Sequence, residues 1–505
     1  MPTLSETYTG LTGRVAPVGS AAPLIAGFAV DSRQVKAGGC FVARPGEQTD
    51  GHHFIPQALA AGAIAVIAER DRLPAGGDAL KAGDAPPGRL YRAQVVDLGV
   101  PATEPLQPPV IFVADDSLAA MQRLAGWWRD RVPGLRVIGI TGSVGKTTLK
   151  ELTAAVLRQR YRTFKSAGNL NSDIGLPVTI LDMPLDSERA VLEMGMTRPG
   201  ELTELAAIAR PVVAVVTNVG PSHLARLGSL EAITSAKAEL VQALPAGGTA
   251  ILNGDDERVS SMAALAPAGV TVLTYGLDPG NTIWASKIES HGLDGISFRF
   301  HYAGQNIAAR LPLLGRHSVH ASLAAAGVGL VEGQSWAEII SGLKDLAELE
   351  VLRLVVVPGI NGSTLLDDTY NASPASVLAA LNLLADLPGR HVAVLGNMLE
   401  LGSYTLKGHQ IVARRAVEIC ELLVTIGELG QLIADEALAS GFDPAQLFAT
   451  SDRAAAVAWL HEHLQPNDMV LIKASHGVRL DEVTNALVET PRQADPPDQP
   501  AEEHP

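Results

Sequence analysis

Residues 141–148 read Thr-Gly-Ser-Val-Gly-Lys-Thr-Thr and stand between two different hydrophobic patterns. Residues 135–140 are largely apolar, as in a buried strand, whereas residues 147–159 repeat apolar side chains at helical spacing. A glycine-rich turn between a strand and a helix lets consecutive backbone N–H groups surround phosphate oxygens. The strict GxxxxGK[ST] spacing is not met, because position 140 is isoleucine. Gly-Lys-Thr-Thr in this setting still predicts a nucleotide-phosphate loop.

The side chains of this loop suit ATP and Mg²⁺. The Lys146 ammonium would reach the β- and γ-phosphates, and the Thr147 hydroxyl would hold Mg²⁺. The simpler alternative is an ordinary strand-to-helix turn. We predict that ATP binds to Gly142, Ser143, Val144, Gly145, Lys146, Thr147 and Thr148.

Outward from the loop, strand-length apolar runs alternate with helical patterns. Further strands are expected at residues 189–193, 212–217 and 249–253, and a later segment repeats the rhythm at residues 391–395, 422–426 and 469–473. Runs that are apolar on both faces and alternate with helices are typical of parallel sheets covered on both sides. The fold class is therefore predicted to be α/β.

The length of 505 residues predicts three domains at roughly 150 residues each. We expect an N-terminal domain over residues 1–108, a central nucleotide-binding domain over 109–347 and a Rossmann-like domain over 348–489. Residues 73–109 are rich in proline and glycine and read as an insertion plus linker. Residues 490–505 are expected to be a disordered tail.

Composition restricts the class of protein. The net charge of −15 disfavours nucleic acid and anionic membranes as partners. Two distant cysteines allow no disulfide framework or CxxC metal pattern, which suits a reducing compartment. Neither a signal peptide nor an apolar run of about 20 residues is evident. We expect a cytoplasmic protein that is not integral to a membrane.

Three more polar residues stand close to predicted strand ends. Glu193 closes a strand, His223 follows another, and Lys237 lies on the next predicted helix. Singly, each has an ordinary interpretation: a solvated carboxylate, a loop histidine and a surface lysine. Parallel sheets bind ligands at the carboxyl ends of their strands, so the shared placement favours a site. Mg²⁺ prefers oxygen ligands, which Thr147, Glu193 and phosphate would supply.

The order of these motifs resembles the Mur ligase family. The phosphate loop, the Asn-Leu-Asn-Ser-Asp-Ile-Gly-Leu-Pro stretch at 169–177, Glu-Met-Gly at 193–195, residues 217–223 and Ala-Lys-Ala-Glu at 236–239 follow one another as in that family. The likeness runs from about residue 27 to residue 485. It implies two Mg²⁺ ions held by Thr147, Glu193, His223 and a carbamylated Lys237. The implied catalytic residues are Lys146, Asn171, Glu193, His223 and Lys237, with Asn169 at the substrate.

The outer segments extend the resemblance. Asp-Ser-Arg at 31–33 and Asp-Gly-His at 50–52 resemble the family's module for the uridine-diphosphate end of its substrate. Asp-Asp-Thr-Tyr-Asn-Ala-Ser-Pro at 367–374, Gly-Asn-Met-Leu-Glu-Leu-Gly at 396–402 and Lys-Ala-Ser-His-Gly at 473–477 resemble the branch that adds D-alanyl-D-alanine. The implied substrate contacts are Ser32, Arg33, Asp50, His52 and Lys473, and the implied nucleotide contacts are His317, Asp368 and Asn371.

Several positions depart from the family pattern. Asn397 replaces an aspartate, Ala474 a glycine and His476 an arginine. Ser318 and Ala321 stand where two asparagines commonly lie beside adenine, so the adenine contacts are left open.

The resemblance implies a monomeric, ATP-dependent ligase that joins D-alanyl-D-alanine to a UDP-N-acetylmuramoyl-tripeptide for peptidoglycan synthesis. A sibling ligase for the third amino acid is the nearest alternative, but the Asp-Asn-Pro-Arg motif of its diaminopimelate-specific form does not occur here. Folylpolyglutamate synthase usually has Gly-Ser after the loop lysine rather than Thr-Thr. A non-catalytic nucleotide-binding regulator and a P-loop switch or transport ATPase are the alternatives from other classes.

Overall fold

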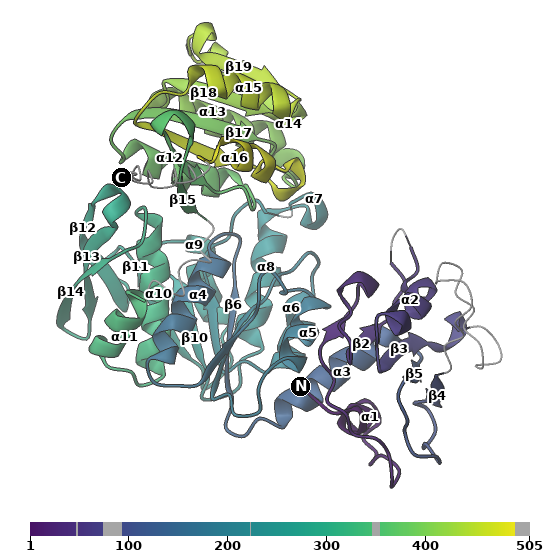
Figure 1. Ribbon diagram of the computed structural model, residues 1–505. Helices are drawn as coiled ribbons and strands as arrows, with labels where there is room; N and C mark the ends of the chain where they lie inside the picture. The colour runs from purple at the N-terminus through teal and green to yellow at the C-terminus, as the bar shows by residue number, and fades with distance from the viewer. Residues whose placement is uncertain (47–48, 74–92, 223, 346–353, 490–505) are drawn as a thin grey trace, which may run out of the picture. The chain divides into compact units, whose positions relative to one another are not determined.

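The computed structural model describes residues 1–46, 49–73, 93–222, 224–345 and 354–489 (Figure 1). The chain divides into two compact units: Met1–His291 with Gly295–Val351, and Gly292–Asp294 with Leu352–Pro505. The first unit holds two sheets and the second holds one. Most of the predicted insertion and the predicted tail lie outside the described residues. No helix among the described residues is long and apolar enough to cross a bilayer.

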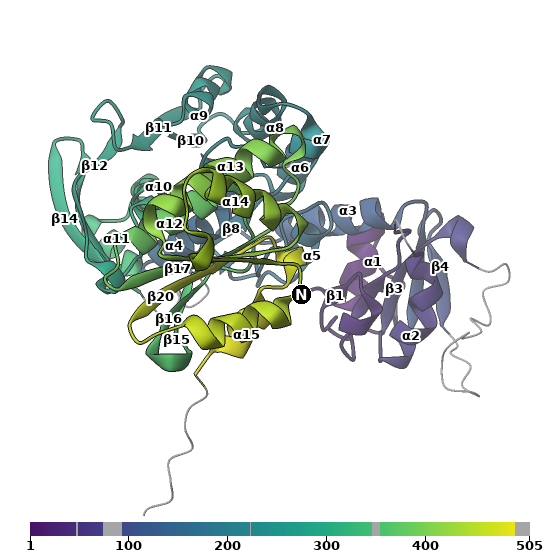
Figure 2. The same ribbon diagram turned by 90° about the horizontal axis from the view of Figure 1, so that it is seen from above.

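The N-terminal sheet of the first unit has five strands in the order β1-β2-β3-β5-β4, all parallel. On one face, Ile55 and Ala58 of α2 join Phe41 in an apolar cluster. Elsewhere in this region, the Tyr8 ring of α1 lies 6.4 Å from the Phe112 ring of β5. Helix α1 lies next to α3 (Figure 2). The elements are α1 (Leu4–Thr12), β1 (Phe28–Ala29), β2 (Cys40–Val42), α2 (Ile55–Ala60), β3 (Ala65–Glu69), β4 (Gln94–Asp97), β5 (Val110–Ala114) and α3 (Ser117–Asp130).

Helix α1 was not predicted from the sequence. Its start carries a capping box in which the Thr3 hydroxyl accepts from the Glu6 N–H and the Glu6 carboxylate accepts from the Thr3 N–H. The Thr-x-x-Glu spacing before an apolar run is the signal that could have located it.

The central sheet has nine strands in the order β14-β13-β12-β11-β10-β9-β6-β8-β7. The strands from β11 to β7 are parallel, and the strands expected at 189–193 and 249–253 are confirmed as β8 and β10. The strands are β6 (Arg136–Thr141), β7 (Thr163–Lys165), β8 (Arg189–Glu193), β9 (Val213–Val216), β10 (Thr249–Asn253), β11 (Thr271–Gly276), β12 (Ile283–Ser290), β13 (Ile296–Tyr302) and β14 (Gln305–Leu311).

The prediction of a parallel sheet does not extend to the far edge. Strands β12, β13 and β14 pair antiparallel with one another, and buried positions alternate with more exposed ones along β13. An antiparallel sheet can expose one face to solvent, so buried and exposed residues alternate along its strands instead of forming continuous apolar runs.

Helices cover both faces of the parallel strands. Gly139 of β6, Ala214 of β9 and Ala250 of β10 stand in one row, and a side chain at Gly139 would meet Leu240 of α8. Ile251, one residue further along, faces the opposite side and lies beside Gly327 of α10. The helices are α4 (Lys146–Arg158), α5 (Gly175–Leu181), α6 (Glu201–Ala209), α7 (Leu224–Leu227), α8 (Leu230–Gln242), α9 (Glu257–Ser261), α10 (His317–Val331) and α11 (Trp336–Leu343).

The second unit contains a six-stranded sheet in the order β15-β16-β20-β17-β18-β19, parallel except for β15. Its strands expected at 391–395, 422–426 and 469–473 are confirmed as β17, β18 and β20. The elements are β15 (Val355–Pro358), β16 (Thr364–Asp367), α12 (Pro374–Ala385), β17 (Arg390–Gly396), α13 (Thr405–Ile419), β18 (Leu422–Ile426), α14 (Glu428–Ala439), β19 (Leu447–Thr450), α15 (Arg453–His463), β20 (Asp468–Lys473) and α16 (Asp481–Leu487).

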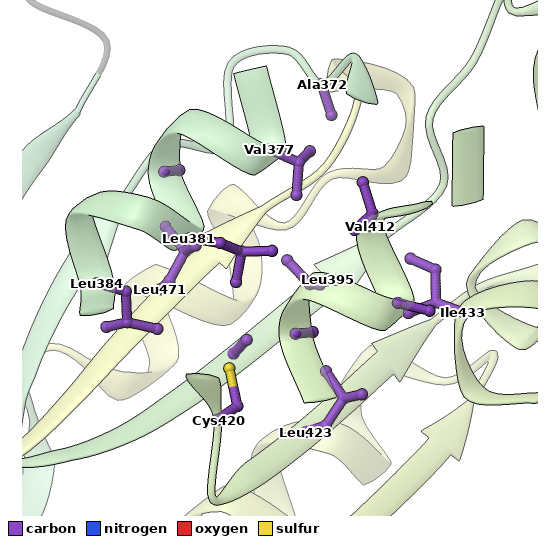
Figure 3. Packing of buried hydrophobic residues seen from close by; sticks show 14 of the residues in the cluster. Ala372, Val377, Leu381, Leu384, Leu395, Val412, Cys420, Leu423, Ile433 and Leu471 are labelled. Atoms are coloured by element: carbon purple, nitrogen blue, oxygen red, sulfur yellow. The ribbon is translucent and has the colours of Figure 1, made fainter. Parts of the chain in front are cut away.

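Two apolar cores sandwich this sheet. Figure 3 shows Leu381 of α12 and Val412 of α13 packed with Leu395 and Leu471 of the strands. A separate cluster joins Leu460 of α15 and other residues of α15 and α16 to the alternate strand positions. The α/β class is thus confirmed.

Strand order creates a switch point in the central sheet, where β6 and β9 are neighbours and the chain continues from β6 towards β7 but from β9 towards β10. Connections leave such a point in opposite directions, which opens a crevice at the carboxyl ends of the strands. The phosphate loop follows β6, and Lys473 ends β20.

Candidate functional site

The phosphate loop connects β6 to α4 through backbone conformations that need glycine. Gly142 has φ of 151° and Gly145 has φ of 84°. A Cβ on Gly142 would lie 1.8 Å from Thr217 Oγ1, so no side chain fits there without a shift. Gly145 stands at the N-cap of α4. Its left-handed backbone directs the first N–H groups of the helix out of the loop.

Part of the loop is bound to the end of β9 rather than open to a ligand. The Ser143 N–H donates to the Asn218 carbonyl at 2.9 Å, and the Val144 N–H donates to Asn218 Oδ1 at 2.8 Å. Ser143 Oγ also bridges the N–H and carbonyl of Gly220. The amides best placed for phosphate are therefore those of the first turn of α4, which have no intrahelical partner. Of the seven residues predicted to bind ATP, Ser143 and Val144 thus have their backbone N–H groups engaged within the protein.

The side chain of Lys146 folds back over its own loop. Its Nζ donates to the Gly142 carbonyl at 2.8 Å. This bond holds the ammonium beside the amino terminus of α4, where a bound anion would meet both a full and a partial positive charge.

Three predicted site residues meet at Glu193, at the end of β8. The Thr147 hydroxyl donates to Glu193 Oε2 at 2.9 Å, and Asn171 Nδ2 donates to Oε1 at 2.7 Å. The Glu193 residue is only 1% exposed. Each carboxylate oxygen is thus oriented by one neighbour, one from α4 and one from the 166–172 loop.

This donor set suits Mg²⁺ brought with a phosphate. A buried carboxylate and an adjacent hydroxyl are hard oxygen ligands, and Mg²⁺ keeps water and phosphate as most of its shell. Within the described ranges, no group of three or more His, Cys, Asp or Glu side chains could hold an ion. The Glu193 carboxylate and the Thr147 hydroxyl would supply protein oxygens to such an ion, with phosphate and water as its other ligands.

Lys237 lies on α8 and is 2% exposed. Burial, followed by the charge of Lys146, holds the pKa of the Lys237 ammonium well below its usual value. Burial therefore disfavours the charged form of this side chain relative to water. His223, its expected partner, lies outside the described residues.

The strand end that precedes His223 is held by a residue that the sequence analysis missed. Asp256 Oδ2 accepts from the Val219 N–H at 2.8 Å, and Oδ1 caps α9. Asn253 Nδ2 donates to the Thr217 carbonyl at 2.8 Å. The signal available was the polar run Asn-Gly-Asp-Asp at 253–256, directly after β10.

Other predicted contacts of this unit lie at its surface or inside its own turns. Asn169 and His317 are exposed, and His317 is the first residue of α10. Ser318 Oγ donates to the Gly315 carbonyl at 2.7 Å. Ser318 is therefore engaged in holding the start of α10 and is buried.

The N-terminal residues fall into two groups. Ser32 is buried and donates to Gln57 Oε1 at 3.0 Å, whereas Arg33 is exposed and paired with Asp31 at 2.7 Å. His52 Nδ1 lies 2.6 Å from Asp50, and its Nε2 accepts from the Glu69 N–H at 2.9 Å. Both nitrogens of His52 are thus engaged within the protein, and a substrate contact would require one of these bonds to break.

In the second unit, Lys473 and Asp368 form a buried pair. Lys473 Nζ lies 2.6 Å from Asp368 Oδ2 and also donates to the Asn371 carbonyl at 2.8 Å. The ammonium fixes both nucleotide-contact candidates at the carboxyl ends of β16 and β20. In this geometry the Lys473 ammonium is engaged by protein groups, and a substrate contact would require these bonds to rearrange.

The departure at Asn397 has a structural role. Its Oδ1 accepts from the Leu429 and Gly430 N–H groups, both at 3.0 Å, at the start of α14. His409 holds the same 396–402 segment, because its Nε2 accepts from the Met398 N–H at 3.1 Å and its Nδ1 lies 2.7 Å from the Thr405 carbonyl. Burial lowers the pKa of His409.

Family models cover most of the chain in three parts. The Mur ligase family catalytic domain matches residues 24–98, the Mur ligase middle domain 140–329, and the Mur ligase glutamate ligase domain 352–476. A protein from Synechocystis sp. named UDP-N-acetylmuramoyl-tripeptide–D-alanyl-D-alanine ligase is 37% identical over 91% of each chain.

Solved structures agree with these matches. MurF from Acinetobacter baumannii superposes with a TM-score of 0.79 at 25% identity, covering 96% of this chain and 98% of that one. MurF from Thermotoga maritima, solved in complex with ADP, gives 0.71 at 27% identity over 91% and 96%. With the phosphate loop, the Glu193 carboxylate and the buried Lys237 in the places described above, the chain belongs to the Mur ligase family.

Proposed function

We propose that this chain is an ATP-dependent ligase that joins D-alanyl-D-alanine to a UDP-N-acetylmuramoyl-tripeptide, forming a C–N bond in peptidoglycan precursor synthesis. The observation that carries the proposal is the convergence of Thr147 and Asn171 on the buried Glu193 beside the phosphate loop, in a chain 37% identical to a protein of that name. Such a precursor and ATP are cytoplasmic solutes, and we expect the chain to act there as a monomer.

The reaction begins with attack of the tripeptide's terminal carboxylate oxygen on the γ-phosphorus of ATP, with ADP leaving. The amine of D-alanyl-D-alanine then attacks the acyl carbon, the tetrahedral intermediate expels phosphate, and the nitrogen loses a proton. No Ser or Cys nucleophile is required. Lys146 and the first-turn amides of α4 neutralise and position the phosphates, so catalysis is chiefly orientation and charge stabilisation.

The proposed metal ligands are Thr147, Glu193, His223 and Lys237. Mg²⁺ when bound would neutralise the charge on the phosphates. Lys237 fits its proposed modification because a buried neutral amine attacks CO₂, releases one proton and becomes a carbamate anion. The carbamate would supply the oxygens that an ammonium cannot, and would relieve the repulsion from Lys146.

The remaining roles follow the family order of the motifs. Asp368 and Asn371 are proposed at the ribose and phosphates, and His317 near the nucleotide. Ser32, Arg33, Asp50 and His52 are proposed for the uridine-diphosphate end, with Asn169 and Lys473 nearer the peptide. Of the uridine-diphosphate set, Arg33 presents an exposed guanidinium, whereas Ser32 and His52 are buried and already hydrogen-bonded.

We also propose three domains, over residues 1–108, 109–347 and 348–489, and each of the three family matches falls within one of them. The first boundary comes just before β5 (Val110–Ala114), which pairs with β3 and β4 in the N-terminal sheet. Apart from Gly292–Asp294, the first two domains belong to one compact unit.

The direct test is phosphate release by the purified chain with ATP, Mg²⁺ and a UDP-tripeptide. Release should require D-alanyl-D-alanine, and single amino acids should not replace it. The Lys146→Ala variant should lose about 10²-fold or more in rate, because it removes the cation facing the transferred phosphate. Release with a UDP-dipeptide and a single amino acid instead would favour the sibling ligase. Nucleotide binding without turnover on any acceptor would favour a regulator.

A further inference from the structure

Two charged side chains of the helix that follows the phosphate loop are buried, and a third, from β7, lies partly exposed beside them. Lys150 is fully buried and Glu151 is 1% exposed. Lys150 Nζ lies 3.2 Å from Glu151 Oε1, and Lys165 of β7 pairs with the other oxygen of Glu151. Lys150 Nζ also donates to the Gly168 carbonyl at 3.1 Å. The ammonium thus joins α4 to the loop that follows β7.

Packing alone does not explain a lysine at position 150. Taking an ion out of water costs several kcal/mol even after relaxation, and an apolar side chain of similar volume often serves a core equally well. The distinctive contribution of Lys150 is its bond to the Gly168 backbone, which no apolar residue can make.

The loop anchored at Gly168 touches the Glu193 strand end on both sides of the anchor. Before it, Ser166 Oγ accepts from the Glu193 N–H at 2.9 Å. After it, Asn171 Nδ2 donates to Glu193 Oε1 at 2.7 Å, and the Asn171 carbonyl accepts from the Gly195 N–H at 2.8 Å. Movement at Gly168 would therefore move Asn171 relative to the carboxylate.

Helix α4 consequently orients both oxygens of Glu193. Thr147 reaches Oε2 directly, and Lys150, one turn later, reaches Oε1 through the backbone of the loop and Asn171. We propose that Lys150 is a positioning residue that holds Asn171 against Glu193 and thereby sets the affinity of this carboxylate for the divalent ion that accompanies nucleotide. The inference rests on the proposed role of Glu193 as a metal ligand.

The test is Lys150→Met, which keeps the length and removes the donor. Binding of Mn²⁺ would be followed by the electron paramagnetic resonance of the free ion, in the presence of the β,γ-methylene analogue of ATP. We expect Mn²⁺ affinity to fall by about 10- to 100-fold, the usual effect of removing a group that orients a metal ligand. The Mg²⁺ concentration for half-maximal phosphate release should rise by a similar factor, with a smaller loss of kcat at saturating Mg²⁺.

Two further variants separate positioning from stability. Lys165→Met removes the other lysine that pairs with Glu151 but keeps the bond to Gly168, so it should leave Mn²⁺ affinity within about threefold of wild type. In Lys150→Met, the buried Glu151 carboxylate loses its Lys150 partner. The double variant Lys150→Met/Glu151→Gln removes that carboxylate, so it should fold more stably than Lys150→Met. It should nevertheless bind Mn²⁺ equally weakly.

Unchanged Mn²⁺ affinity in the folded double variant would overturn the inference, as would an equal loss in Lys165→Met. Failure of the proposed function looks different: the wild-type chain would then bind Mn²⁺ with the analogue but release no phosphate with any UDP-tripeptide.

Discussion

Lys237 shows how the environment of one residue changes its chemistry. On a helix surface this side chain would be a solvated ammonium, but at 2% exposure, near Lys146, burial disfavours the charged form. Carbamylation would replace the disfavoured buried positive charge with a negative one and would remove the repulsion from Lys146.

We expect Lys237→Ala to abolish ligation, and added bicarbonate not to restore it, because no amine remains to be carbamylated. A short carboxylic acid such as acetate should recover part of the activity by supplying oxygens at the vacated position. Phosphate release with and without each additive measures this, and Lys344→Ala, an exposed lysine at the end of α11, is the matched control. Full activity of Lys237→Ala at low Mg²⁺ would remove the residue from the metal site.

At the scale of elements, the turn from β6 to α4 depends on two glycines for different reasons. A Cβ at Gly142 collides with Thr217, whereas a Cβ at Gly145 meets no atom within 4 Å and only its positive φ opposes substitution. Gly142→Ala should therefore abolish nucleotide binding and lower the melting temperature, while Gly145→Ala should cost about 1–2 kcal/mol and weaken binding less. Calorimetric titration with ADP compares the two. Equal effects would mean that the collision with Thr217 is relieved by movement of the loop.

The segment 396–402 is attached to α13 through a histidine that must stay neutral. Protonation of His409 Nε2 would destroy its bond to the Met398 N–H. Because burial lowers the pKa of His409 in the folded state, the unfolded chain binds a proton first as the pH falls below about 6.5. Stability from this group is therefore present above that pH and declines as the pH falls towards the folded pKa.

Wild type should accordingly unfold at a higher urea concentration than His409→Gln. The difference between the two urea midpoints should be smaller at about pH 5.5 than at about pH 7.5. Glutamine does not titrate, so its own midpoint reports the rest of the protein. A difference between the two proteins that stays constant with pH would show that His409 does not titrate in this range.

At the scale of the whole molecule, the chain contains two compact units, the first with two sheets and the second with one, and each unit has its own apolar core. Such units commonly unfold as separate transitions. Calorimetry should show a calorimetric enthalpy larger than the van 't Hoff enthalpy. Binding of MgADP should raise the unfolding temperature of the unit that carries the phosphate loop. A ligand at 100 times its dissociation constant stabilises the folded state by about 2.7 kcal/mol. Lys146→Ala should show a smaller shift, and a single two-state transition would contradict the division.

The local sequence determined much of this protein. The apolar runs located β8, β10 and β18 to the residue, and the Gly-Lys-Thr-Thr turn located the phosphate loop. These are short-range properties, since a buried parallel strand must be apolar on both faces and a phosphate loop must bend at glycine. The order of motifs likewise predicted Glu193, Asn171 and Lys237 as one site, and the structure brings Asn171 into contact with Glu193.

Only the tertiary structure decided which polar side chains are hydrogen-bonded or ion-paired within the protein. His52 and Lys473 were expected at the substrate, but their nitrogens are bound by Glu69 and Asp368 respectively. Asp256, which follows β10, bonds to Val219 beyond β9, and Lys150 of α4 bonds to Gly168 beyond β7. The antiparallel strands β12–β14 also escaped notice, because their half-exposed faces leave a weaker pattern than buried runs. Hydrogen bonds between residues far apart in the sequence produce no periodic pattern in the sequence, because the packing of sheets and helices determines which residues become partners.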